Sequence, residues 1–164
     1  MRIPKKRRIE RKTNYSKRLK LLKGNLPRMV FRKTNKYLIA QYIISEEAKD
    51  KVEIGLNSKK LLEYGFPENA SLKSVPAAYA LGYLIGKKII KEKKEVPIID
   101  FGMIRSLNKS KCYAFLKGIV DSELKIKYNE EKDLFPSQER IEGQHLKNKI
   151  ELKKILEKMK WVKE

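Results

Sequence analysis

Residues 27–45, PRMVFRKTNKYLIAQYIIS, decide how this chain folds. Two runs rich in β-branched and aromatic residues, Arg28 to Thr34 and Tyr37 to Ser45, flank a tight turn at Asn35-Lys36. Two extended runs joined by so short a turn predict an antiparallel hairpin. Lys51 to Leu56 follows a polar turn and predicts a third strand. The opening of the folded region is therefore expected to be a three-stranded meander.

After the meander the apolar period lengthens from two residues to the helical value. Ser58 to Tyr64 predicts a short helix, and Ser74 to Lys94 predicts the main helix of the domain. Ser74 is suited to be its N-cap, and Pro76 in the first turn lacks an N–H that would be unpaired there anyway. A strip of small residues at helical spacing is expected to let this helix lie close on the sheet: Ala78, Gly82 and Gly86.

Val96 to Phe101 follows the main helix and predicts a buried strand parallel to the earlier ones. Lys109 to Ser122 predicts a further helix, with Tyr113, Leu116 and Val120 facing the sheet. Ser137 begins a last helical region. The tail from Leu146 to Glu164 carries an apolar stripe that needs a surface to dock on, with Trp161 near its edge: Leu152, Ile155, Leu156 and Met159.

These elements predict an α/β fold. We expect a mixed sheet made of a three-stranded antiparallel meander plus a parallel strand, with helices packed on it, a basic N-terminal arm and a C-terminal helix. The expected division is a basic N-terminal arm at 1–24, an α/β core domain at 25–136 and a C-terminal helical extension at 137–164. The turn signal at 24–27 separates the arm from the core.

The positive charge of the chain is concentrated at its start. Residues 1–36 hold fifteen Lys or Arg and one acid, Glu10, which gives +14 of the net +20. Such a segment repels itself and is expected to be disordered when free. It suits a dense polyanion, because each phosphate that it neutralises releases counterions. Five of the nine arginines lie in the arm, and the arginine fork grips phosphates with two hydrogen bonds.

Composition excludes several other classes of protein. The arm has too few large apolar residues for an amphipathic membrane helix, so no membrane partner is expected. Cys112 is the only cysteine, which rules out an intramolecular disulfide and indicates a small buried side chain in a reducing cytosol. His145 is the only histidine. We therefore expect no metal site, no cofactor and no small-molecule substrate.

One motif and one set of carboxylates resemble parts of catalytic sites. Asp100-Phe101-Gly102 matches a kinase motif, but the other kinase motifs are absent, and Asp100 is expected to end a strand and cap a turn. Asp100, Asp121 and Glu123 could hold Mg²⁺ in an RNA-processing nuclease of α/β fold, which is the alternative function. A DNA-compacting basic protein is a third hypothesis. We predict that the chain has no catalytic residues and is not an enzyme.

Four stretches of sequence resemble a known family. They begin with Asn14 to Leu19, Pro27 to Lys36 continuing to Ala40-Gln41, and Pro76 to Tyr79 with Gly82 and Gly86. The fourth runs from Asp100-Phe101-Gly102 and Arg105, through Ala114 to Gly118 and Asp121, to Phe135-Pro136-Ser137 and Glu139 to Gly143. In this order they resemble the 5S rRNA-binding proteins of the large ribosomal subunit, family eighteen of the universal series, in its archaeal type. The likeness covers about residues 13–146. Lys109-Ser110-Lys111 and Gln144-His145-Leu146 depart from the usual pattern.

The resemblance implies a structural protein of the ribosome in the cytoplasm. It implies that the protein lies in the central protuberance, binds 5S rRNA and anchors it to the large-subunit rRNA. Neighbouring large-subunit ribosomal proteins are expected partners. The arm would supply phosphate contacts, and the hairpin would lie beside a 5S rRNA helix, where Asn35 and Gln41 can hydrogen-bond 2′-hydroxyls and base edges.

Candidate RNA-binding residues come from the arm, the hairpin and the region around the start of the helix predicted at 109–122. The arm supplies Lys5, Lys6, Arg7, Arg8, Arg11, Lys12, Tyr15, Lys17, Arg18 and Lys20, with Tyr15 as a stacking face. The hairpin supplies Arg28, Arg32, Lys33, Asn35, Lys36 and Gln41, and the later region supplies Arg105, Lys109 and Lys111.

Overall fold

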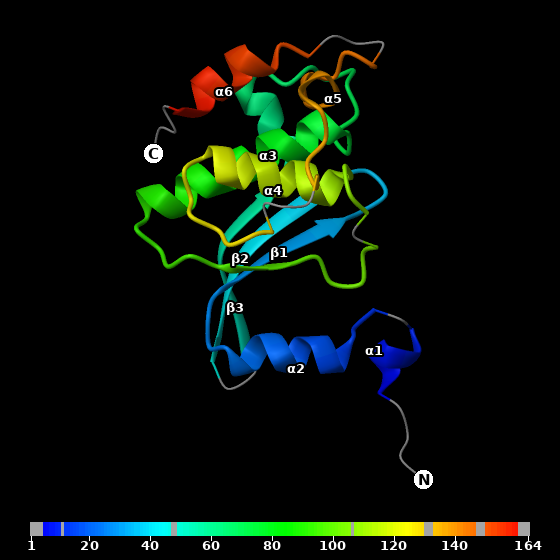
Figure 1. Cartoon of the computed structure of the whole chain (residues 1–164), viewed down its shortest axis with the longest axis vertical. Coiled ribbons are helices and arrows are strands. Elements are labelled where there is room, and N and C mark those ends of the chain that lie inside the picture. The colour runs from blue at the N-terminus through cyan, green and yellow to red at the C-terminus, as the bar shows by residue number, and fades with distance from the viewer. Residues whose placement is uncertain are drawn as a thin grey trace.

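The computed structural model describes residues 5–10, 12–46, 49–105, 107–129, 133–146 and 150–160. A four-stranded sheet lies at the centre of the molecule, with two long helices on one face and further helices beyond them (Figure 1). The N-terminal helices lie at the other side of the sheet, at one end of it. The predicted α/β fold with a mixed sheet is confirmed.

The sheet has the strand order β3-β2-β1-β4. Strand β1 (Arg28–Lys33) pairs antiparallel with β2 (Leu38–Glu46), which pairs antiparallel with β3 (Lys49–Asn57). The predicted meander is therefore confirmed. A Thr34–Tyr37 turn closes the hairpin: the Thr34 N–H donates to the Tyr37 carbonyl at 2.9 Å, and the Tyr37 N–H donates to the Thr34 hydroxyl at 2.9 Å.

Alternation along β1 gives the sheet two different faces. Met29 and Phe31 have no exposed surface and point to the helices, whereas Arg28, Val30 and Arg32 point to the opposite side. We call this opposite side the second face. The apolar face packs directly on a helix, where the rings of Phe31 and Phe115 stack with 4.5 Å between their centroids.

Strand β4 (Ile98–Asp100) pairs with β1 in parallel, as predicted. The prediction that this strand is buried is only partly right, because β4 lies at the edge of the sheet. Ile98 and Ile99 are half-buried and Asp100 is buried. A short edge strand presents few unpaired backbone groups, which limits pairing with other chains.

The main helix, α3 (Val75–Lys91), begins at the predicted N-cap, where the Ser74 hydroxyl accepts from the Ala77 N–H at 3.3 Å. Every residue of α3 up to Gly86 is buried. The reason is that α3 contacts elements on several sides: the sheet, α4 (Lys111–Asp121), α5 (Gln138–Glu142), α6 (Leu152–Lys160) and the 3₁₀ helix η1 (Ser58–Tyr64). The short helix predicted at 58–64 is thus present as a 3₁₀ helix.

The small-residue strip of α3 faces α4 and not the sheet, so that part of the prediction is wrong. A Cβ atom at Gly82 would overlap the Phe115 backbone, and one at Gly86 would overlap the Ser122 side chain. Gly118 in α4 lies equally close to the Tyr79 carbonyl. The two helices approach backbone to backbone at these glycines.

The buried side of α4 consists mainly of Cys112, Phe115 and Ile119. Leu116 is buried as predicted, but Tyr113 and Val120 are only half-buried, because the true stripe is offset by one residue from the predicted one. The expectation of a buried Cys112 is confirmed.

The C-terminal stripe docks on the domain itself. Leu152, Ile155 and Met159 are buried, Leu156 is half-buried, and α6 packs on α3 and η1. Helix α6 is shorter than the predicted tail helix, and Trp161 lies outside the described residues. No helix in the described parts of the chain is long and apolar enough to cross a membrane.

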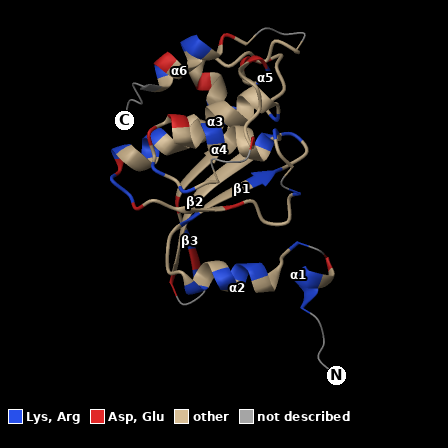
Figure 2. Ribbon diagram, in the orientation of Figure 1, with Lys and Arg blue, Asp and Glu red and all other residues tan. Residues whose placement is uncertain are grey.

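The arm contains regular structure, so the expectation of a disordered arm is wrong for its described residues. Lys6–Ile9 form the short helix α1, and Tyr15–Lys23 form α2. Figure 2 shows that Lys and Arg residues, in blue, recur along both helices. The physical reason for the order in α2 is its contact with the sheet, described next.

Candidate nucleic-acid interface

Helix α2 is capped at both ends by its own sequence. The Asn14 side-chain oxygen accepts from the Lys17 N–H at 3.1 Å, and the Gly24 N–H donates to the Leu21 carbonyl at 3.3 Å. These caps satisfy backbone groups that a free helix end leaves unpaired. No residue of α2 is fully buried. The helix therefore lies on the surface of the domain and does not enter its core.

Two polar contacts connect α2 to the sheet region. The Lys17 ammonium donates to the Gly102 carbonyl at 3.3 Å, and Arg18 pairs with Asp50 at 2.8 Å. Because Gly102 follows β4 and Asp50 lies in β3, the helix is tied to both edges of the sheet.

Arg28 does not lie on an exposed strand face, as the sequence had indicated, but is buried at the second face of the sheet. Its side chain is only 4% exposed. The guanidinium donates to Asp50 at 2.6 Å and to the Ser45 hydroxyl at 2.9 Å, and it lies 3.8 Å from Asp100. A buried cation needs such partners, because leaving one unpaired in the interior is strongly unfavourable.

Arg32 is half-buried and locked to the end of β4. It pairs with the Asp100 carboxylate at 3.0 Å and donates to the Asp100 carbonyl at 2.8 Å. The other carboxylate oxygen accepts from the Gly102 N–H at 2.7 Å, which confirms that Asp100 ends a strand and caps a turn. Gly102 has a φ of +61°, and a Cβ there would meet the Arg32 guanidinium, so glycine is favoured at this position.

The two carboxylates beneath α2 are held ionised. Burial alone would raise the pKa of Asp100, but the Gly102 N–H and the Arg32 guanidinium outweigh it and lower the pKa below its ordinary value. Burial likewise opposes the shift at Asp50, and hydrogen bonds from Ser45, Arg18 and Arg28 lower its pKa. Both side chains are therefore negative counterions for the arginines around them.

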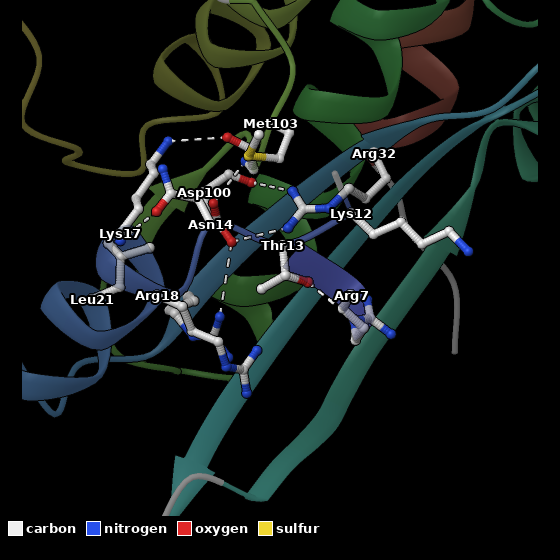
Figure 3. A pocket seen from close by; sticks show the side chains of 12 residues that line it. Arg7, Lys12, Thr13, Asn14, Lys17, Arg18, Leu21, Arg32, Asp100 and Met103 are labelled. Carbon is white, nitrogen blue, oxygen red and sulfur yellow. Dashed lines mark hydrogen bonds and ion pairs between the residues drawn. The ribbon is translucent and has the colours of Figure 1, made fainter. Parts of the chain in front are cut away.

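A small cavity lies between the arm and the second face of the sheet. Its volume is about 120 Å³, and Figure 3 shows the side chains that line it. Six of the lining residues are basic: Arg7, Lys12, Lys17, Arg18, Arg28 and Arg32. Figure 3 shows Arg32 and Asp100 on one side of this space and Thr13 and Arg7 on another. Arm and sheet thus contribute cations to one shared site.

A second basic surface lies around the hairpin turn that follows β1. Lys33, Asn35 and Lys36 are exposed there. Lys111 at the start of α4 is half-buried close by. Burial, followed by repulsion from Lys33 and Lys73, lowers the pKa of Lys111. Sequence reasoning missed Lys73, because its nearness to Lys33 and Lys111 is created only by the fold.

The remaining predicted residues are distributed over several places. Lys5 lies over the Tyr15 ring at 4.7 Å, so one ring face already has a cation partner. Gln41 is half-buried in the middle of β2, opposite Val30 and away from the hairpin turn. Lys109 pairs with Asp133. Lys6, Arg8, Lys20 and Arg105 are exposed, and Arg11 lies outside the described residues.

The carboxylates of the nuclease hypothesis do not meet. Asp100 pairs with Arg32, Asp121 accepts from the Tyr79 hydroxyl at 2.8 Å, and Glu123 pairs with Lys87 at 3.0 Å. Among the described residues, no group of three or more acidic, histidine or cysteine side chains could hold a metal ion. The three carboxylates instead stabilise local structure.

The fold and its surface define a class of protein: a small α/β domain that presents excess positive charge around a helical arm and a hairpin turn, as polyanion-binding proteins do. The particular family follows from comparison with known proteins. The family model described as "Ribosomal large subunit proteins 60S L5, and 50S L18" matches residues 1–98. The chain belongs to this family.

Individual relatives extend the match over most of the chain. The "Large ribosomal subunit protein uL18" of Korarchaeum cryptofilum is 40% identical over 141 residues, which cover 86% of this chain and 70% of the relative. The proteins of the same name from Methanospirillum hungatei and Methanoregula boonei are each 37% identical over 141 residues, covering 86% of this chain and 78% and 79% of the relatives.

Family membership confirms three predictions. The chain is a structural protein of the large ribosomal subunit, it is not an enzyme, and its place is the ribosome in the cytoplasm. The nuclease alternative is therefore wrong. Membership also implies rRNA as a partner.

Proposed function

We propose that this protein binds 5S rRNA and anchors it to the large-subunit rRNA in the central protuberance of the ribosome. The observation that carries the proposal is the position of its two basic surfaces. The arm and its cavity lie against the second face of the sheet, where both Arg28 and Arg32 of β1 line the cavity, and the hairpin turn with Lys33 and Lys36 follows the end of β1, with Lys111 nearby. The two surfaces come from different elements, α1 and α2 for one and the hairpin turn with the start of α4 for the other, so they can contact separate RNA segments.

The proposed division of labour follows from exposure. Exposed lysines and arginines on α1 and α2 suit phosphates, which give affinity without reading sequence. The exposed Asn35 at the hairpin turn can instead donate and accept hydrogen bonds, as reading of 2′-hydroxyls and base edges requires. We therefore keep residues 1–24 as the RNA-binding arm, 25–136 as the core and 137–164 as the C-terminal extension. Neighbouring large-subunit proteins are proposed as further partners.

The direct test is binding of 5S rRNA against tRNA by the full chain at several salt concentrations. We expect selective binding of 5S rRNA at moderate salt. Changing four exposed arm residues, Lys5, Lys6, Arg8 and Lys20, to Gln should weaken binding to both RNAs. It should also reduce the slope of log K against log salt by about 3, since each neutralised phosphate contributes roughly 0.7–0.9.

A charge-matched control uses four exposed lysines of the core that are not predicted to touch RNA. Changing Lys60, Lys93, Lys125 and Lys127 to Gln removes the same charge. Equal loss of slope in the two quadruple variants would show that net charge alone, and not the arm, binds RNA. Equal affinity of the unaltered chain for 5S rRNA and tRNA would contradict the proposed function.

A further inference from the structure

We propose that the cavity between the arm and the second face of the sheet is a binding site for a single phosphate group. The inference deepens the proposed function and rests on it only for the source of the phosphate, which would be the RNA backbone. The site is complete only when α2 is docked on the sheet, because arm and sheet each supply part of its lining.

The first argument is charge. Six positive side chains line the cavity, and the carboxylates paired with them are Glu10, Asp50 and Asp100. Six cations against three anions leave a net charge of +3 around one small space. In the part of the chain that the structure describes, Arg7 has no carboxylate partner; its Nε donates to the Thr13 hydroxyl at 3.1 Å. A doubly or singly charged anion would balance this excess.

The second argument is an unsatisfied donor. The Nε–H of Arg28 is buried and has no hydrogen-bond partner among the described residues, whereas the Nη2 of that guanidinium donates to Asp50 and to Ser45. Arg28 lines the cavity. Buried donors are rarely left unpaired, because the group has lost its water without replacement. A phosphate oxygen is an acceptor of the kind that this donor lacks.

The third argument is size and rigidity. The volume of about 120 Å³ leaves room for one tetrahedral phosphate group. Arg18, Arg28 and Arg32 are already fixed by Asp50 and Asp100, so little side-chain freedom is lost when an anion binds. Asp100 does not repel the anion strongly, since Arg32 and Arg28 lie beside its carboxylate.

The test begins with inorganic phosphate and the full chain, without RNA. Phosphate is titrated against chloride at constant ionic strength while the ¹H–¹⁵N NMR signals of the backbone and of the arginine Nε–H groups are followed. We expect saturable shifts at Thr13, Asn14, Gly102 and the Arg28 Nε–H. Arg7→Gln should weaken phosphate binding about tenfold, the value of one charge-assisted hydrogen bond.

Arg8→Gln is the matched control, because Arg8 lies in the same short helix, is exposed and does not line the cavity. It should change phosphate affinity less than about twofold, as surface charges do. Shifts that never saturate, or equal weakening by Arg7→Gln and Arg8→Gln, would overturn the site. Both variants keep the buried arginines, so loss of folding does not confuse the result.

A second arm of the experiment identifies the source of the phosphate. If it belongs to RNA, Arg7→Gln should weaken 5S rRNA binding more than Arg8→Gln does, and inorganic phosphate should compete with the RNA. A site that binds phosphate while both variants bind RNA equally would take free phosphate compounds instead, which supports the site but not its RNA occupant. Failure of 5S rRNA selectivity would contradict the proposed function alone, since the phosphate titration contains no RNA.

Discussion

Arg18 in α2 and Asp50 in β3 form a 2.8 Å ion pair across 32 positions of the chain. The pair joins the basic arm to the sheet, and the same carboxylate accepts from the buried Arg28. One acidic side chain thus helps to hold in place a segment whose own charge opposes its folding.

Asp50→Asn is expected to destabilise the protein and release α2. The change leaves the Arg28 guanidinium, 4% exposed, with only the more distant Asp100 as a counterion. We expect the free energy of unfolding to fall by about 2–3 kcal/mol, less than the roughly 3–5 kcal/mol of a fully buried pair because Asp50 is 28% exposed. Urea unfolding measures the loss, and faster amide exchange at Tyr15–Lys23 reports the release.

The control for this variant is Asp133→Asn. Asp133 also pairs with a cation, Lys109, but its side chain is 76% exposed. An exposed pair contributes little, so its removal should leave stability and α2 exchange unchanged. Equal effects of the two variants would show that Asp50 has no special role.

Acid should destabilise the protein by protonating Asp50 and Asp100. The pKa values of Asp50 and Asp100 are lowered in the folded protein from 3.8. Their stabilising contribution is therefore fully present above about pH 4 and is lost as the pH falls from there through the folded-state pKa values. Urea unfolding between pH 7 and pH 3 should show this loss, and the decline should be shallower in Asp100→Asn, which has one of the two groups removed.

Sequence reasoning found the elements better than their contacts. The meander was predictable because alternation and the Asn35-Lys36 turn are local signals. The sequence could not predict which element Gly82 and Gly86 face, because a strip of small residues allows close approach to a sheet or to another helix. The order of α2 depends on Asp50, which is distant in sequence. Arg28 likewise appeared to be one more surface cation until Ser45, Asp50 and Asp100 were placed around it.

Gly82→Ala is expected to push α3 and α4 apart. The new methyl group would overlap the Phe115 backbone, which cannot move away as a flexible side chain can. Overpacking costs about 1–3 kcal/mol, which outweighs the gain of roughly 1 kcal/mol that Ala brings to a helix. Thermal unfolding measures the net loss. Gly55→Ala is the control, since its Cβ would make only an ordinary contact at 3.6 Å with Val52.

The hairpin turn should govern selectivity. Asn35→Ala combined with Lys36→Ala changes two exposed residues and leaves the Arg32–Asp100 pair intact. We expect discrimination between 5S rRNA and tRNA to fall about tenfold, because loss of a contact that reads the RNA costs roughly 1–3 kcal/mol. Arm substitutions should instead weaken both RNAs alike. If hairpin and arm variants lose affinity in parallel across RNAs, the proposed division is wrong.

The docking of α6 should make its apolar stripe important for stability. Met159 has no exposed surface, and Ile155 is 3% exposed. Truncating either side chain to Ala removes buried volume, which lowers the free energy of unfolding by about 2–5 kcal/mol in a core. The loss here cannot exceed the free energy with which α6 docks on the domain. We expect Ile155→Ala to speed amide exchange across Leu152–Lys160 while the sheet stays protected. Glu157→Ala, on the exposed side of the same helix, should change neither quantity. Exchange of Leu152–Lys160 at random-coil rates in the unaltered protein would show that the stripe does not hold the helix to α3 and η1.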